Sequence, residues 1–178
     1  MLKISENAKY SDRELVSRAL DDQRHFSHIV DRYSEKLMRY IRRITNITEQ
    51  DREDVLQNVF IKTYINLNAF DTSLSFNAWI YRITHNEVVD FSRKQKRSIK
   101  HGYIDTDDDF FLSEKDPFGI LEGYNNNEDK ELMKKVFNEI SEKNREILYF
   151  RFIENYSYRD ISDILQKPES NVTSMIHR

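Results

Sequence analysis

The chain has 178 residues, of which 38% are hydrophobic and 33% are charged, and its formal net charge is -3. That balance excludes a protein that binds nucleic acid through bulk positive charge, so any such binding must come from local basic clusters. The lack of cysteine excludes disulfides and thiolate metal sites. No run reaches the ~20 apolar residues that a membrane span needs, and the N-terminus lacks a signal-type hydrophobic stretch. We therefore expect a cytoplasmic chain without a membrane span.

The fold class follows from composition and periodicity. Only three glycines and two prolines occur, and the apolar residues recur with a helical period, so strands and hairpins have little support. A chain of this length corresponds to roughly one or two domains. We predict an all-α fold with two small helical domains, at residues 1–100 and 128–178, joined by an acidic flexible linker at 101–127. The second domain is expected to end in a helix-turn-helix.

The first helical stretch is expected to begin near Arg13, because Ser11 and Glu14 supply capping and first-turn acidic chemistry. Apolar residues at helical spacing continue to about residue 45, and a break near Asp21 would divide the stretch into two helices.

Two histidines in that stretch, His25 and His28, lie three residues apart and could share a helix face as metal ligands. No carboxylate motif completes a site around them, so we expect no metal and no cofactor.

The next helix is expected to follow Thr48, which precedes Asp51 by three residues in the arrangement of a capping box. Its apolar residues recur at steps of three and four: Val55, Leu56, Val59, Phe60, Tyr64 and Leu67. The outward face carries Asp51, Asp54, Gln57 and Asn58. First-turn carboxylates also complement the helix dipole, so this acidic face has a purely structural explanation as well.

A polar turn at residues 70–76 precedes a further helix, which holds the single tryptophan. Its apolar positions are Phe76, Trp79, Ile80, Ile83, Val88 and Phe91. Tyr81, Arg82, His85 and Asn86 are expected to point outward, which is also typical of an ordinary solvated helix face. The helix continues into a basic run without an intervening acid, at Arg93, Lys94, Lys96, Arg97 and Lys100. Such a run is typical of phosphate contacts.

Two motifs stand out in this central part of the chain. The pattern D-x-x-D-x-x-Q-x-x-F occurs at Asp51, Asp54, Gln57 and Phe60. The pattern W-I-Y-R-I-x-x-N-x-x-x-D follows at residues 79–90. In this order, the two motifs resemble the polymerase-binding and promoter-melting region of bacterial sigma factors, specifically the extracytoplasmic-function (ECF) group of the sigma-70 family.

The resemblance implies core RNA polymerase and promoter DNA as partners, and an anti-sigma protein as a candidate partner. It assigns polymerase binding to the outward face at Asp51, Asp54, Gln57 and Asn58. It assigns capture of the separated promoter strand to Phe70, Ser75, Phe76, Trp79, Tyr81, Arg82 and Asn86, since an extruded base needs a pocket. The basic side chains of Arg93, Lys94, Lys96 and Arg97 would then bind phosphates.

The segment 101–127 changes composition, with seven acidic residues against a single lysine between residues 105 and 122. Pro117, Gly119 and Gly123 break any helix there, so the segment is predicted to be a linker. A solubilising disordered tether explains it without further function. The resemblance implies instead that the linker follows the path that RNA later occupies inside the polymerase.

The last third of the chain returns to a helical pattern. Residues 145–152 resemble the family motif R-E-[VI]-L-x-L-R-[YF], which leads into a helix-turn-helix. Ser157 is the expected cap of the first motif helix, and residues 166–168 are the expected turn. The buried side of the second helix is predicted to be Val172, Met175 and Ile176.

The outward set of that second helix is Asn171, Thr173, Ser174, His177 and Arg178, and the resemblance assigns duplex DNA recognition to it. The chain departs from the family pattern at Ser162, usually alanine, and at Gln166, usually glycine. A non-glycine residue in the left-handed region costs on the order of 1 kcal/mol, which a helix-turn-helix can tolerate. Pro168 fits the first turn of a helix. Since the chain stops within this helix, we expect a truncated recognition helix.

Enzymatic functions have little support, because neither a glycine-rich phosphate loop nor a nucleophile signature occurs. Three interpretations therefore stay open: a sigma factor, a stand-alone helix-turn-helix regulator of transcription, and a helical protein-interaction module. The second leaves the motifs at residues 51–97 without a role, and the third makes both the basic run and the helix-turn-helix accidental. Association with core RNA polymerase separates the first from the others.

Overall fold

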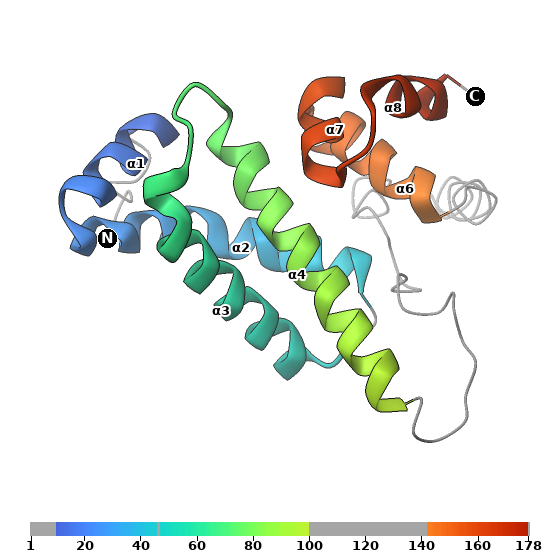
Figure 1. Ribbon diagram of the computed structural model, residues 1–178, viewed down its shortest axis with the longest axis horizontal. Coiled ribbons are helices and arrows are strands. Elements are labelled where there is room, and N and C mark those ends of the chain that lie inside the picture. Colours follow the sequence, from blue (N-terminus) through green and yellow to red (C-terminus); the bar gives the residue numbers. More distant parts are fainter. Residues whose placement is uncertain (1–9, 46, 100–141, 178) are drawn as a thin grey trace, which may run out of the picture.

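The computed structural model describes residues 10–45, 47–99 and 142–177, and these residues form helices and short connections without a strand (Figure 1). The N-terminal group consists of α1 (Asp12–Asp21), η2 (Gln23–His25), α2 (Phe26–Ile44), α3 (Glu49–Asn66), η3 (Leu67–Ala69) and α4 (Phe76–Ile99). The C-terminal group consists of α6 (Glu142–Leu148), the π-helical turn η6 (Tyr149–Ile153), α7 (Tyr158–Leu165) and α8 (Glu169–Ile176). The all-α prediction is confirmed. The predicted linker at 101–127 lies outside the described residues.

Capping chemistry sets where α1 begins and ends. The backbone N–H of Ser11 donates to the carboxylate of Glu14 at 2.7 Å, and the N–H of Glu14 donates to the hydroxyl of Ser11 at 3.3 Å. This reciprocal pair is the capping box that satisfies helix N-terminal donors. The helix ends at Asp21, at the expected break, and the Asp22 carboxylate then accepts from the N–H of Arg24 at 2.9 Å.

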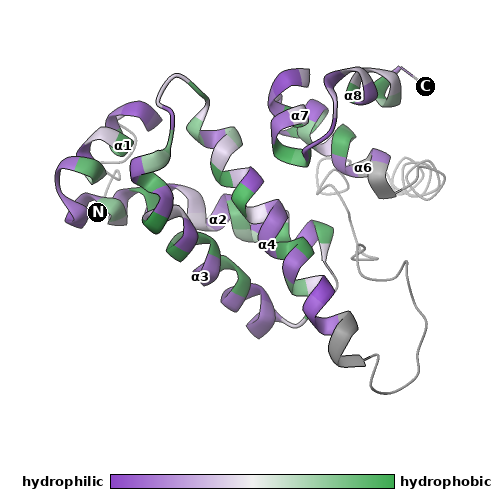
Figure 2. Cartoon of the chain, viewed as in Figure 1, coloured by the Kyte–Doolittle hydropathy of each residue, from purple (hydrophilic) through white to green (hydrophobic). Residues whose placement is uncertain are grey.

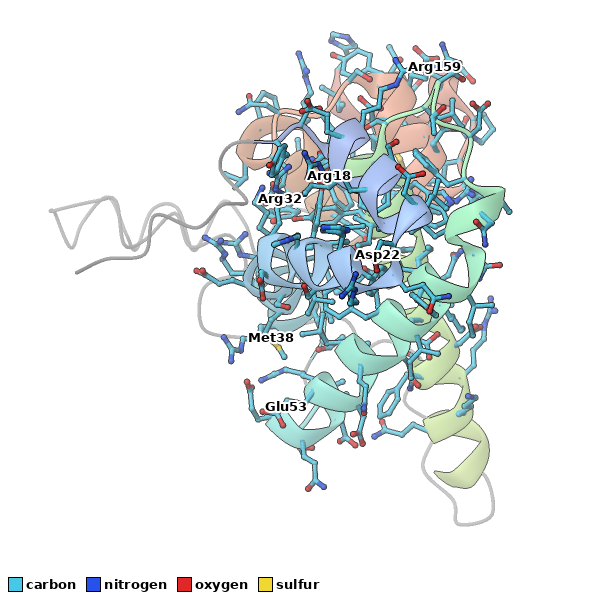
Figure 3. All side chains as sticks on the ribbon, turned by 90° about the vertical axis from the view of Figure 1, so that its left-hand side faces the viewer. Arg18, Asp22, Arg32, Met38, Glu53 and Arg159 are labelled. Carbon is cyan, nitrogen blue, oxygen red and sulfur yellow. The ribbon has the colours of Figure 1, made fainter. Side chains whose placement is uncertain are left out.

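The core of the N-terminal group lies between α2, α3 and α4. Its fully buried members include Ile29, Leu37, Ile41, Val55, Val59 and Ile80. The rings of Tyr33 and Phe76 meet edge to face at 5.6 Å, which joins α2 to the start of α4. Arg32 of α2 reaches back to Asp12 at 2.7 Å and so attaches α1 to this core. Figure 3 shows Arg32 on α2 and Arg18 on the neighbouring α1. Hydrophilic residues gather at the N-terminal end of α3 and on the C-terminal half of α4 (Figure 2).

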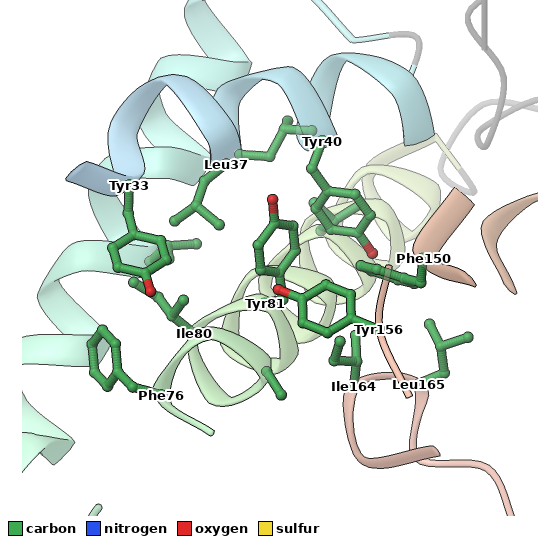
Figure 4. Packing of buried hydrophobic residues seen from close by; sticks show 14 of the residues in the cluster. Tyr33, Leu37, Tyr40, Phe76, Ile80, Tyr81, Phe150, Tyr156, Ile164 and Leu165 are labelled. Carbon is green, nitrogen blue, oxygen red and sulfur yellow. The ribbon is translucent and has the colours of Figure 1, made fainter. Parts of the chain in front are cut away.

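The C-terminal group packs directly on the N-terminal group. Helix α7 lies against α4, and buried aromatic rings from both groups meet between them (Figure 4). Tyr81 of α4 contacts Phe150 and Tyr156, with ring centroids 5.7 Å away in both cases. The hydrophobic residues of the two groups therefore form one continuous core, a contact that helical periodicity did not predict.

Candidate functional site

The N-terminal turn of α3 carries the predicted polymerase-binding residues. The N–H of Asp51 donates to the hydroxyl of Thr48 at 3.1 Å, so Asp51 takes part in the helix cap and is half-buried. Asp54, Gln57 and Asn58 are exposed and have no part in that cap. On the opposite side of the helix Val55 is fully buried, so this part of α3 has one solvent-exposed face and one face in the core. The exposed amide and carboxylate groups are available to a partner.

The solvent-exposed face of α3 is apolar in its C-terminal half, which we did not predict from the sequence. Ile61 is 48% exposed and Ile65 is 68% exposed. Positions 54, 58, 61 and 65 follow the helical spacing of a single face, which was the signal that could have revealed this extension. Tyr64 was predicted to lie in the core, and this was wrong, since it is 39% exposed. The exposed face of α3 is therefore acidic and amide-bearing at its start and apolar at its end.

The 70–76 loop is held by its own side chains. The Asp71 carboxylate accepts from the N–H of Ser73 at 2.9 Å, and the Ser75 hydroxyl accepts from the N–H of Ala78 at 3.2 Å, which caps α4. The rings of Phe70 and Phe76 are buried under this loop.

Trp79 lies beside these rings, with its centroid 4.9 Å from that of Phe70 and 5.6 Å from that of Phe76. Trp79 is only partly buried, so one side of the indole reaches the surface. The three rings form an aromatic platform under the loop, and Ser75 is exposed above it. Such a platform can support a stacked nucleotide at its edge.

Helix α4 presents its polar residues unequally. Tyr81 was expected to point outward, and this was wrong: its side chain is fully buried beneath the C-terminal group. Arg82 and His85 are half-buried, and Asn86 is exposed as expected. The cause of the error is the packing of η6 and of the segment before α7 on this face of α4.

A cavity of about 260 Å³ lies where the 70–76 loop and α4 face α7. Its N-terminal wall includes Ser75, Trp79 and Arg82, and its opposite wall includes Arg159 and Asp163. The predicted strand-capture residues and α7 therefore border the same space.

The basic end of α4 is helical through Ile99, as predicted. Arg93 and Lys94 are exposed, and Arg93 lies 3.7 Å from the carboxylate of Asp90. Lys96 and Arg97 belong to the same helix, but their side chains lie outside the described part of the chain. Two successive cations are thus presented to solvent near the end of the helix.

The helix-turn-helix forms where it was predicted. Ser157 caps α7 in a capping box with Asp160. Gln166 occupies the left-handed region, with φ 52° and ψ 43°, as its position in place of glycine required. Pro168 was placed in the first turn of α8, but it directly precedes Glu169, where the helix begins.

Helix α8 has one buried residue, Val172, with Met175 and Ile176 half-buried beside it. Asn171, Ser174 and His177 are exposed, whereas Thr173 is half-buried. The hydroxyls of Thr173 and Ser174 donate to carbonyls one turn earlier, at 3.0 Å and 2.8 Å. Arg178 lies outside the described residues. The exposed set still forms a polar face of a short helix.

Within residues 10–45, 47–99 and 142–177, no helix is long and apolar enough to cross a membrane. The same residues contain no group of three or more histidine, cysteine, aspartate or glutamate side chains placed to hold a metal ion.

Two family models match the chain. The model described as Sigma-70 region 2 covers residues 29–98, and the model described as Sigma-70, region 4 covers residues 130–178. The first match contains α3, most of α2 and α4, and both motifs of the central region, and the second contains the helix-turn-helix. The fold and these surfaces therefore define a sigma-70-type transcription protein.

Relatives narrow the family further. The chain is 31% identical to ECF RNA polymerase sigma factor SigW of Bacillus subtilis over 170 residues, covering 88% of this chain and 86% of the relative. It is 30% identical to the ECF RNA polymerase sigma-E factor of Escherichia coli strain K12 over 176 residues, covering 94% and 90%. The chain belongs to the ECF group of RNA polymerase sigma factors.

Solved structures share the fold. The complex of CnrH with the cytosolic domain of CnrY gives a TM-score of 0.60 at 23% identity, over 94% of this chain and 90% of that one. The sigma factor RpoE of Bartonella quintana, solved with the anti-sigma factor NepR, gives a TM-score of 0.61 at 19% identity. That match covers 86% of this chain and 90% of RpoE.

The family predicted from the sequence motifs is confirmed. The protein is a sigma factor: it binds core RNA polymerase and promoter DNA and directs transcription initiation. Residues 51–97, which a stand-alone helix-turn-helix regulator would leave without a role, lie within sigma region 2.

Proposed function

We propose that the exposed face of α3 is where this chain binds core RNA polymerase, with Asp54, Gln57 and Asn58 as the contacting residues. The observation that supports this most directly is their exposure on a helix whose opposite face is fully buried at Val55 and Val59. These side chains do not hold the helix in place, so a partner can use them without unfolding it. Asp51 contributes charge while capping the helix.

The second part of the proposal concerns the separated promoter strand. The 70–76 loop and the first turns of α4 form its binding surface, with Ser75, Trp79, Arg82 and Asn86 as the residues that a base or phosphate can reach. Phe70 and Phe76 support this surface from below through ring contacts with Trp79. Tyr81 joins the surface only when the C-terminal group does not cover it.

Two other surfaces complete the DNA contacts. Arg93 and Lys94, continued by Lys96 and Arg97, bind phosphates without regard to sequence. The polar face of α8, with Asn171, Ser174 and His177, reads the duplex in the major groove, as recognition helices of this motif do. Thr173 contributes at the edge of that face, and Arg178 is proposed to contact the same duplex.

The division of labour follows the chain: residues 1–100 act as the region-2 domain, 128–178 as the region-4 domain, and 101–127 as the connection between them. The chain carries out no catalysis of its own, since RNA synthesis is chemistry of the polymerase. It acts in the cytoplasm, where the polymerase is. Because two related folds were solved with anti-sigma partners, CnrY and NepR, an anti-sigma protein is also proposed as a partner here.

The test of the polymerase surface is an affinity measurement. Fluorescently labelled chain is titrated with core RNA polymerase, and Asp54→Arg is compared with Asp21→Arg. Both carboxylates are exposed, but Asp21 lies at the end of α1 and not on α3. We expect Asp54→Arg to weaken binding at least about tenfold, because it reverses a charge at the proposed contact and so spoils its electrostatic complementarity. Equal affinities for both variants would contradict the assignment.

A further inference from the structure

A cluster of three polar side chains joins the two helical groups. The Tyr40 hydroxyl of α2 donates to Oε1 of Glu146 in α6, 106 positions away along the chain. Nδ1 of His85 in α4 lies 2.9 Å from the same oxygen and 3.3 Å from the Tyr40 hydroxyl. The side chains of His85 and Glu146 are each only 14% exposed. One carboxylate of the C-terminal group is therefore held by two helices of the N-terminal group.

Aromatic rings surround this cluster and come from both groups (Figure 4). The Tyr40 ring contacts Tyr81 at 5.3 Å, Phe150 at 5.2 Å and Tyr149 at 6.0 Å. The guanidinium of Arg43 lies 4.9 Å from the centroid of Tyr149. These contacts leave Glu146 little exposed to water, and hydrogen bonds are stronger in such surroundings.

The same packing covers part of the proposed strand-binding surface. Tyr81 has no exposed surface, and α7 faces Trp79 and Arg82 across the 260 Å³ cavity. A single strand that follows the 70–76 loop onto α4 would have to pass through the space bordered by Arg159 and Asp163. In this arrangement the strand and the C-terminal group compete for one face of α4.

We propose that this contact is an autoinhibitory latch, in which Glu146 bound to Tyr40 and His85 holds the C-terminal group over α4 until the chain opens to bind a promoter strand. The part of the proposal that concerns the strand rests on the proposed function of the 70–76 loop and α4. The closed contact itself does not depend on that assignment.

The composition of the interface suits a reversible contact. Glu146 gives up water for two hydrogen bonds, an exchange that is costly for a carboxylate unless both partners stay in place. Within the described residues the buried hydroxyl of Tyr156 has no hydrogen-bond partner, which further weakens the closed state relative to an open one. Loss of one partner of Glu146 should therefore shift the balance between the two states.

The test uses the full chain, which contains no cysteine. Ser73→Cys and Asp163→Cys introduce spin labels on opposite walls of the cavity, at two exposed positions. Double electron–electron resonance then measures the distances between the labels. We expect one short-distance population for the labelled parent chain. Glu146→Gln and Tyr40→Phe should each add a long-distance population and raise the open-to-closed ratio at least about tenfold, as loss of a hydrogen bond to a charged group implies.

Tyr40→Phe removes only a hydroxyl and keeps the ring, so it tests the latch without disturbing the aromatic packing. Glu169→Gln makes the same amide substitution at an exposed site of α8 and should leave the distances unchanged. Unchanged distances in both latch variants, or an equal shift in Glu169→Gln, would overturn the latch. A labelled parent chain that is already mostly open would also overturn it.

Binding of a fluorescent single-stranded oligonucleotide of mixed sequence tests the covering of α4. Glu146→Gln should bind it more tightly than the parent chain, by a factor comparable to the increase in the open fraction. Opening without tighter binding would overturn the claim that the contact blocks a strand. Failure of the proposed strand surface would appear as opening in the spin-label experiment without tighter oligonucleotide binding, whereas failure of the latch would appear as unchanged label distances, so the two failures are distinguishable.

Discussion

The hydroxyl of Ser162 donates to the backbone carbonyl of Lys167 at 2.5 Å, across the turn of the helix-turn-helix. Gln166 occupies the left-handed region within that turn. The serine that departs from the usual alanine of the family therefore spans the turn in which a glutamine takes the place of glycine. The two departures occur in one local structure.

The turn makes a stability prediction. Ser162→Ala should lower the free energy of unfolding by about 1 kcal/mol, because a hydrogen bond to a turn carbonyl is lost. Gln166→Gly should raise it by up to about 1 kcal/mol, because glycine has no steric penalty at this φ. Denaturant titration measures both changes. Asn155→Gly is the control: Asn155 also has a positive φ, of 56°, but asparagine tolerates that region better, so a smaller gain is expected. An equal gain at both sites would contradict the explanation.

The apolar end of α3 makes a second prediction. Ile65→Ser should leave stability within about 0.5 kcal/mol of the parent, because an exposed side chain is replaced. It should weaken association with core RNA polymerase if the docking surface includes the apolar half of α3. Leu37→Ala, at a fully buried site, should instead cost about 2–5 kcal/mol of stability. Thermal unfolding and polymerase titration separate the two effects, and a large stability loss in Ile65→Ser would show that this residue is structural.

The two proposed DNA-contacting parts of α4 should respond differently to mutation. Lys94→Ala should weaken binding to all promoters about equally, because one phosphate contact is lost. The slope of the logarithm of the binding constant against the logarithm of the salt concentration should fall in magnitude by roughly 1. Asn86→Ala should cost about 1–3 kcal/mol at one promoter position only. Open-complex formation on promoters substituted one base at a time provides the measurement. A uniform loss of open-complex formation across all substituted promoters in Asn86→Ala would show that this surface does not read bases.

The latch has a defined pH dependence. Burial raises the pKa of Glu146, but the hydrogen bond and charge of His85, the hydroxyl of Tyr40 and the charge of Lys167 together lower it below its ordinary value of 4.5. A lowered pKa in the closed state means that the carboxylate contributes closing free energy above the ordinary pKa. That contribution is lost as the pH falls through the lowered value.

We therefore expect the labels at positions 73 and 163 to separate as the pH falls through the lowered pKa of Glu146. The Glu146→Gln variant should lack this transition, and circular dichroism should show that the helices persist through it. A transition of the same size in Glu146→Gln would assign it to other carboxylates.

Local signals in the sequence predicted the helices well. Ser11, Thr48 and Ser157 each cap the helix that was expected to follow, because a cap depends on residues within one turn. The left-handed conformation of Gln166 was predicted for the same reason. The exposed residues Asp54 and Asn86 followed from periodicity relative to buried neighbours.

Errors arose where a distant part of the chain decides the environment. Tyr81 is on the polar side of α4 by spacing, but it is buried by Phe150 and Tyr156, which lie about 70 positions later. The periodicity of apolar residues identifies the faces of a helix, but it does not show how many of those faces other parts of the chain bury. Tyr64 is the opposite case, since its position on the apolar face has no neighbour that covers it fully. The Tyr40–His85–Glu146 cluster joins three separate elements, and no local pattern contains it.

The most direct test of the account is transcription in vitro with purified core RNA polymerase and a library of genomic DNA fragments, with and without this protein. We predict transcripts with defined start sites that appear only when the chain is present, are lost with Asp54→Arg and persist with Asp21→Arg. If the same start sites appeared without the chain, or Asp54→Arg supported them as well as the parent, the central claim that region 2 binds the polymerase through α3 to direct initiation would be contradicted.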